Sequence, residues 1–98
     1  MPIEKVERDH NLRIQFPPPR RGSVEYSVEA DVPVSTYVLD KQTLSEFDEG
    51  KTQIKSFGGF SRRRKHYQTL NLPGKRNWYL LIVNENDEDA AVHYEVYD

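Results

Sequence analysis

The strongest chemical signal in the sequence is a run of basic residues: Arg62, Arg63, Arg64, Lys65 and His66. Guanidinium and ammonium groups bind phosphate and carboxylate groups, so a run this dense could hold phosphate, nucleic acid or an acidic protein. Lys51 and Lys55 extend the positive charge upstream. In a strand, neighbouring side chains point to opposite faces, so both faces of this run would be charged and neither could be buried. The run therefore predicts a loop or an exposed edge strand.

Two interpretations of the basic run remain open. Phe57, Phe60 and Tyr67 lie nearby and could stack on nucleic-acid bases, which would favour an anion-binding site. Basic side chains also protect an exposed edge strand from pairing with other chains, and this is the interpretation that we favour. The pI of about 5.9 argues against nucleic acid, because domains that bind nucleic acids are usually basic.

The charges are separated along the chain into three blocks. Residues 1–50 carry six Lys and Arg against ten Asp and Glu, residues 51–76 carry eight Lys and Arg and no acid, and residues 77–98 carry six acids and no Lys or Arg. The net charges of the blocks are therefore −4, +8 and −6, and that of the chain is −2. The acidic blocks repel the same polyanion that the basic block attracts. This pattern favours a protein partner over nucleic acid.

Two further segments offer groups that could bind ions. Phe57-Gly58-Gly59-Phe60 has backbone amides that could cradle a phosphate, but it has neither Walker spacing nor a following helix, so a bulge or sharp bend is the better interpretation. The acidic segment 84–89 could bind calcium through its oxygen atoms. It lacks the glycine of an EF-hand loop and has strand-like sequence on both sides, which favours a solvated hairpin loop.

The sequence contains no recognisable catalytic or metal-binding motif. The histidines His10, His66 and His93 have neither H-x-x-H nor H-E-x-x-H spacing, and Ser61 is not in a G-x-S-x-G elbow. The chain has no cysteine, which excludes disulfides and thiolate metal sites. We therefore expect no enzyme activity, no catalytic residues, no metal site and no cofactor.

Alternating apolar and polar residues predict a chain made mostly of strands. The candidate strands are 12–16, 24–32, 34–39, 54–57, 67–72, 78–83 and 92–96. Two of them, 34–39 and 78–83, are apolar on both faces and should lie nearer the centre of the structure, with Trp78 in the core. Short strands at this spacing predict an all-β fold, an antiparallel β-sandwich of about seven or eight strands.

One short helical connection is expected between the strands. Thr43 and Glu46 have the spacing of a capping box, and Gly50 suits the left-handed position that ends a helix. One or two helical turns between them should carry Leu44 and Phe47 inward.

Length and composition agree with one small domain, because 98 residues leave no room for a second core. We expect a flexible N-terminal segment over 1–11 and a single domain over 12–98. No apolar run reaches the ~18 residues that a membrane helix needs, and segment 1–8 is too charged for a signal peptide. We therefore expect a cytoplasmic protein that does not contact the membrane.

Several hydrophobic and glycine positions resemble a known bacterial domain. The matching segments are Val38-Leu39-Asp40, Phe47, Gly50-Lys51, Phe57-Gly58-Gly59-Phe60, Leu72-Pro73-Gly74 and Trp78-Tyr79-Leu80. Over residues 22–98 the chain resembles a small bacterial β-sandwich domain of unknown function that is sometimes attached to TIR domains. Its C-terminal half is also similar to bacterial pre-peptidase C-terminal domains and to GOLD domains. The resemblance implies a binding or accessory module; the basic run and the acidic segment 84–89 are not part of the pattern.

The sequence thus predicts a non-enzymatic protein-interaction or accessory module. It would bind a protein partner through an exposed edge and the opposed charge blocks, and the same edge could join copies of the chain into a homo-oligomer. One alternative is an anionic ligand, phosphate or nucleic acid, bound by the basic segment 51–76. Another is a carbohydrate-binding or cell-envelope module built on Tyr67, Trp78 and Tyr79.

Overall fold

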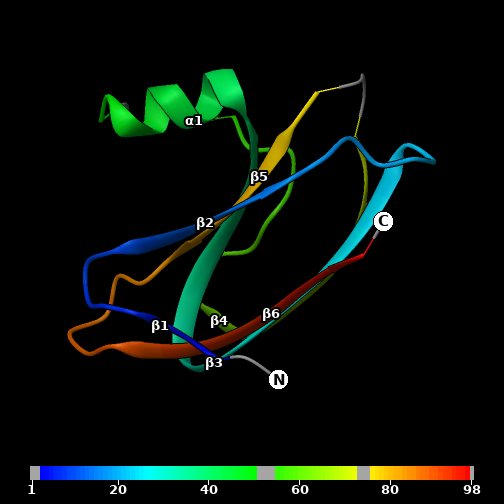
Figure 1. Ribbon diagram of the computed structural model, residues 1–98. Helices are drawn as coiled ribbons and strands as arrows, with labels where there is room; N and C mark the ends of the chain where they lie inside the picture. The colour runs from blue at the N-terminus through cyan, green and yellow to red at the C-terminus, as the bar shows by residue number, and fades with distance from the viewer. Residues whose placement is uncertain (1–2, 51–54, 73–75, 98) are drawn as a thin grey trace.

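The computed structural model describes residues 3–50, 55–72 and 76–97, which form a β-rich chain with one helix (Figure 1). In chain order the elements are β1 (Glu4–Val6), β2 (Asn11–Phe16), β3 (Ser23–Asp40), α1 (Lys41–Asp48), β4 (Arg63–Asn71), β5 (Trp78–Val83) and β6 (Ala90–Tyr97). Every pair of these strands is antiparallel, as the sequence predicts. The described residues contain six strands, so the predicted number of seven or eight is wrong.

The long strand β3 organises the sheet. Its first half pairs with β4 and β6, and its last six residues, Ser35–Asp40, pair with β5. The sequence predicts separate strands at 24–32 and 34–39, whereas the structure has one continuous strand of 18 residues. Pro33 explains the difference: it has no N–H to donate, which interrupts pairing without ending the extended backbone. The register between β3 and β4 shifts at this point.

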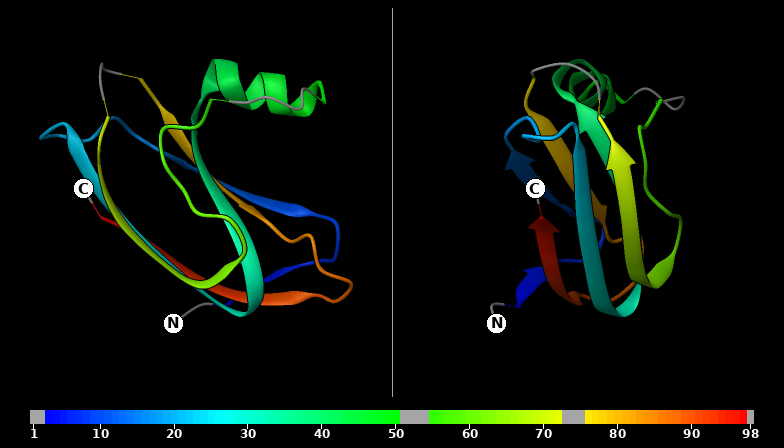
Figure 2. Two further views of the ribbon diagram at one scale, coloured as in Figure 1. Left: turned by 180° about the vertical axis from the view of Figure 1, so that it is seen from behind. Right: turned by 90° about the vertical axis from the view of Figure 1, so that its right-hand side faces the viewer.

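The sheet is strongly curled, so that its two halves face each other (Figure 2). The strand order is β1-β6-β3-β5-β2, with β4 on the other side of β3 from β6. We call β1, β6, β4 and the first half of β3 the lower half, and β2, β5 and the end of β3 the upper half, as they lie in Figure 1. The bend in β3 joins the two halves, because this strand contributes to both.

The main hydrophobic core fills the space between the two halves. Trp78 and Leu80 from the upper half and Val28 and Val92 from the lower half are fully buried, which confirms the prediction for Trp78. The Trp78 ring meets that of Phe57 edge-on, with 4.7 Å between the ring centroids. A smaller apolar cluster lies between α1 and the upper half and contains Leu39, Leu44 and Leu81.

Helix α1 follows β3 directly and begins earlier than the sequence predicts. Asp40 is the N-cap residue, and its Oδ1 accepts hydrogen bonds from the backbone N–H and the hydroxyl of Thr43, at 2.8 and 2.7 Å. Thr43 therefore lies inside the first turn and is not itself the cap. Leu44 is buried as predicted, and Gly50 has a φ of +83° just beyond the helix end. No helix among the described residues has the length and apolarity to span a membrane.

Part of the N-terminal segment belongs to the sheet. The sequence predicts a flexible segment over 1–11, but Glu4–Val6 form β1, which pairs with Ala90–Val92 of β6, and Val6 is buried. β2 also begins one residue before the predicted boundary, at Asn11. A strand of three residues that carries two charged side chains has too short an alternation to be detected from sequence.

Candidate interaction surface

The basic run lies at the start of β4, on an edge of the sheet. Arg63, Arg64 and Lys65 are the first three residues of the strand and all three are exposed; Arg62 precedes them with a φ of +48°. Among the described strands β4 pairs only with β3, so its other side has no partner strand. The prediction of an exposed edge strand is confirmed, and we call Arg62–Lys65 the basic edge.

His66 does not belong to this surface, which corrects the prediction that it contributes to binding. Its side chain points between the two halves of the sheet and the residue is only 2% exposed. The ring Nε2 lies 2.8 Å from the carbonyl oxygen of Arg63 and the ring Nδ1 lies 3.0 Å from the hydroxyl of Thr36. Because a carbonyl can only accept, Nε2 carries the proton and Nδ1 accepts from Thr36. Burial lowers the pKa of His66, although its hydrogen bonds to backbone carbonyls oppose that shift.

The Phe57–Phe60 loop closes against β3 and contacts the basic edge through Phe60. The N–H of Phe60 donates to the Thr36 hydroxyl over 3.1 Å, and the N–H of Gly59 donates to Oε1 of Gln68 over 3.0 Å. Because these amides already have partners inside the protein, the loop does not offer a phosphate cradle. The interpretation as a sharp bend agrees with this arrangement, and Gly58 forms a single antiparallel bridge with Val38 of β3.

The loop also orients one arginine of the basic edge. The guanidinium carbon of Arg63 lies 4.2 Å from the centroid of the Phe60 ring, within the range of a cation–π contact. Such a contact is worth about 0.5–1 kcal/mol at an exposed site. It limits the number of conformations of Arg63 while its N–H groups still reach solvent.

The acidic segment 84–89 meets the basic edge in space. Nη2 of Arg62 lies 3.6 Å from Oε2 of Glu85, and Ser35 donates its hydroxyl to the other carboxylate oxygen of Glu85. In the sheet, Glu29 of β3 is paired with Lys65 of β4. The side chains of Arg62 and Glu85 are 73% and 47% exposed, so this ion pair adds little stability. The charge blocks that are separate in the sequence therefore form one mixed surface.

Asn84 organises the acidic segment, a structural role that the sequence analysis does not predict. Its side chain is fully buried, and its Nδ2 donates to the carbonyl oxygens of Val6 and Glu88, at 2.9 and 2.8 Å. Its Oδ1 accepts from the N–H of Asn86. Within the described residues no group of three or more His, Asp and Glu side chains is arranged to hold a metal ion. A polar residue ending an apolar strand was the signal that could have identified Asn84.

The remaining predicted site residues lie in different places. Lys51 falls outside the described residues, and Lys55 is exposed in the segment that leads to the Phe57–Phe60 loop. Tyr67 is 65% exposed on β4, whereas Trp78 is inside the main core and Tyr79 packs against the smaller cluster below α1. Neighbouring residues of a strand face opposite sides, so Trp78 and Tyr79 cannot share a surface. The three residues therefore do not form the aromatic platform on which the carbohydrate-binding alternative depends.

Comparison with known proteins adds little to this description. No known protein family matches the sequence, and no curated protein matches it either. A solved structure with a related shape is the secreted serine protease VesC from Vibrio cholerae, with 12% sequence identity and a TM-score of 0.49. The match covers 95% of this chain but only 20% of the VesC chain.

Proposed function

We propose that this chain is a non-enzymatic, cytoplasmic protein-interaction module that binds a partner through β4. One observation carries the proposal: β4 pairs with a described strand on one side only, and its first three residues, Arg63–Lys65, are all exposed and basic. The N–H and C=O groups along such an edge can pair with an extended segment of another protein. The charges at one end of the strand would select a segment with acidic residues and fix its register.

The charges around the basic edge support a protein segment over a polyanion. Glu29 lies beside Lys65 in the sheet, and Glu85 lies 3.6 Å from Arg62. Further along β4, the Tyr67 hydroxyl donates a hydrogen bond to the carboxylate of Glu25. A nucleic acid would bring phosphates close to these carboxylates and be repelled by them, whereas a protein segment can place its own basic residues opposite them.

One observation favours an anionic ligand as a second candidate. Phe60 holds Arg63 in place, so its guanidinium is partly preorganised for phosphate or carboxylate before any ligand arrives. A small phosphate-bearing ligand could contact Arg63 without reaching Glu25.

We also infer that the two halves of the curled sheet act as the layers of a β-sandwich, because the main core is shared between them. Trp78 and Leu80 face Val28 and Val92 across this core. This arrangement would hold the position of β4 without help from the partner.

Photo-crosslinking in living cells tests the proposal. A benzophenone amino acid replaces Tyr67, which is exposed on β4, and a control variant carries it at Gln42, which is exposed on α1. We expect a discrete protein adduct from position 67, absent from position 42 and lost when Arg62, Arg63, Arg64 and Lys65 are all replaced by Gln. Equal adducts from both positions, or an adduct that survives the four replacements, would contradict the proposal.

A further inference from the structure

A second edge of the sheet, on the far side from β4, is incomplete. β1 pairs with β6 over three positions only, Ala90–Val92. β6 continues to Tyr97 with β3 on one side, but no described strand pairs with Tyr94–Tyr97 on the other side. In the upper half, the corresponding edge is occupied by β2, which pairs with β5 along its whole length. Within the described part of the chain, the lower half therefore has no strand segment beside Tyr94–Tyr97 on this side.

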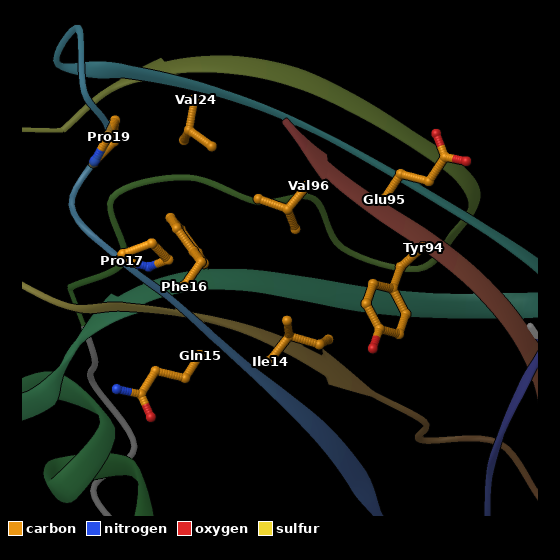
Figure 3. A pocket seen from close by; sticks show the side chains of 9 residues that line it. All are labelled: Ile14, Gln15, Phe16, Pro17, Pro19, Val24, Tyr94, Glu95 and Val96. Atoms are coloured by element: carbon orange, nitrogen blue, oxygen red, sulfur yellow. The ribbon is translucent and has the colours of Figure 1, made fainter. Parts of the chain in front are cut away.

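An apolar cavity of about 310 Å³ lies at this gap (Figure 3). Ile14 and Phe16 of β2 line one side and Tyr94 and Val96 of β6 line the other, and their side chains point toward one another across the opening. These residues belong to, or pack against, the main core. The main core can thus be reached from outside through this cavity, because no edge strand among the described residues covers it.

The outward side of the same strand segment is acidic. Glu95 lies between Tyr94 and Val96 in sequence, so its side chain takes the opposite face of the sheet, and its carboxylate is 3.3 Å from Nε2 of His93. Glu25 and Glu29 of the neighbouring β3 are exposed on this face. In antiparallel pairs, opposite charges on facing residues are favourable and like charges are not. A strand added at the edge of β6 would therefore be favoured if it placed a basic residue opposite Glu95.

We propose that the edge of β6 binds an extended segment of a partner protein with the pattern apolar–basic–apolar. The segment continues the line of β1 along β6 and pairs with Tyr94–Tyr97 through the backbone. Its two apolar side chains enter the cavity beside Tyr94 and Val96, and its Lys or Arg faces Glu95. Two observations identify this occupant. β1 already pairs with the same edge of β6, which favours an extended segment, and the negative charge of Glu95 favours a basic residue opposite it. The site is separate from the basic edge and does not depend on the function proposed for β4.

Selection from a phage-displayed library of random nine-residue peptides tests the proposed pattern. We expect the wild-type protein to enrich peptides with apolar–basic–apolar alternation and to exclude proline from the central positions. With Glu95→Lys, the preferred central residue of the selected peptides should change from basic to acidic. The affinity of this variant for a synthetic peptide that was selected with the wild-type protein should be lower by about three- to tenfold. Glu29→Lys, a change of the same kind on the same face but one strand inward, should leave the selected pattern unchanged. Val96→Thr should weaken every selected peptide without changing the central preference.

The binding position is mapped by adding the synthetic peptide to isotope-labelled protein and following the backbone amide resonances. We expect the largest changes at Tyr94–Tyr97 and at Ile14–Phe16, with β4 unaffected. Several results would overturn the proposal: no alternating pattern among selected peptides, largest changes on β4, or no response of the selected pattern to Glu95→Lys. A stable dimer in sedimentation with the β6 edge protected would assign the edge to a second copy. A hydrophobic dye that fills the cavity while no peptide binds would make it a small-molecule pocket.

Discussion

Replacing Gly59 with alanine should detach the Phe57–Phe60 loop from β3. Gly59 has a φ of +125°, and a Cβ atom at this position would lie 2.0 Å from the carbonyl oxygen of Thr36 and 2.7 Å from its carbonyl carbon. Both are backbone atoms of β3, which is held by pairing with β5 at this point. The loop must move away from the strand, because the strand cannot yield without losing that pairing.

The expected loss of stability has two parts. An alanine held at this φ is strained by about 1–3 kcal/mol. Displacement of the loop also breaks some of three backbone hydrogen bonds to β3, which join Thr36 N to Phe60 O, Val38 N to Gly58 O and Phe57 N to Val38 O over 2.8–2.9 Å. With about 0.5–1.5 kcal/mol for each and two broken, the total loss is about 2–6 kcal/mol.

Urea unfolding monitored by the fluorescence of Trp78, the one tryptophan of the chain, measures this loss. Gly22→Ala provides the matched control, because Gly22 also has a positive φ, +75°, but no atom lies within 4 Å of its added Cβ. The control should lose only the conformational cost of about 1–2 kcal/mol. Equal losses in the two variants would refute the close approach of the loop to β3.

Three further predictions concern the core and the pH response. Trp78→Ala should lower the free energy of unfolding by about 3–5 kcal/mol in urea, and the native protein should not emit at the wavelength of fully hydrated indole. Burial lowers the pKa of His66, so below about pH 6.5 the unfolded chain binds a proton at this residue more readily than the folded chain does. The free energy of unfolding should therefore fall as the pH drops below about 6.5 and stay level above it. Unfolding midpoints that do not differ between pH 7.5 and 5.5, or a difference retained in His66→Gln, would contradict this. Asn84→Ala leaves the carbonyls of Val6 and Glu88 without their donor and should cost about 2–4 kcal/mol, with faster amide exchange in β1.

Alternation of apolar residues was sufficient to locate most strands, because each has one face in the main core. β2, β5 and β6 lie where the pattern predicts them, and Trp78 is buried as expected. The curl of the sheet could not be predicted, because it depends on a single strand that serves both halves. From the local sequence, a proline inside an apolar stretch predicts the end of a strand. Only the strands that pair with β3 on either side of Pro33 show that it continues through this residue.

The candidate site was predictable in its position and not in its composition. Consecutive charges cannot be buried on both faces of a strand, and this places Arg63, Arg64 and Lys65 on an edge. His66 is different because it shares a face with Leu70, which packs against the main core, and its two ring nitrogens find partners inside the protein. A buried histidine with both nitrogens bonded depends on residues far apart in the sequence, here Thr36, and local spacing does not reveal it.

The measurement that most directly tests the role of the basic edge is a fluorescence anisotropy titration with single- and double-stranded nucleic acid near physiological ionic strength. It compares the wild-type protein with the variant in which Arg62, Arg63, Arg64 and Lys65 are replaced by Gln. If the basic edge serves a protein partner, wild type should bind nucleic acid no more tightly than the usual nonspecific range, with Kd of about 1–100 µM, because the carboxylates of Glu29 and Glu85 lie beside the basic side chains. Submicromolar binding by wild type that falls steeply with salt and is lost in the variant would contradict this and make the basic edge an anion-binding site.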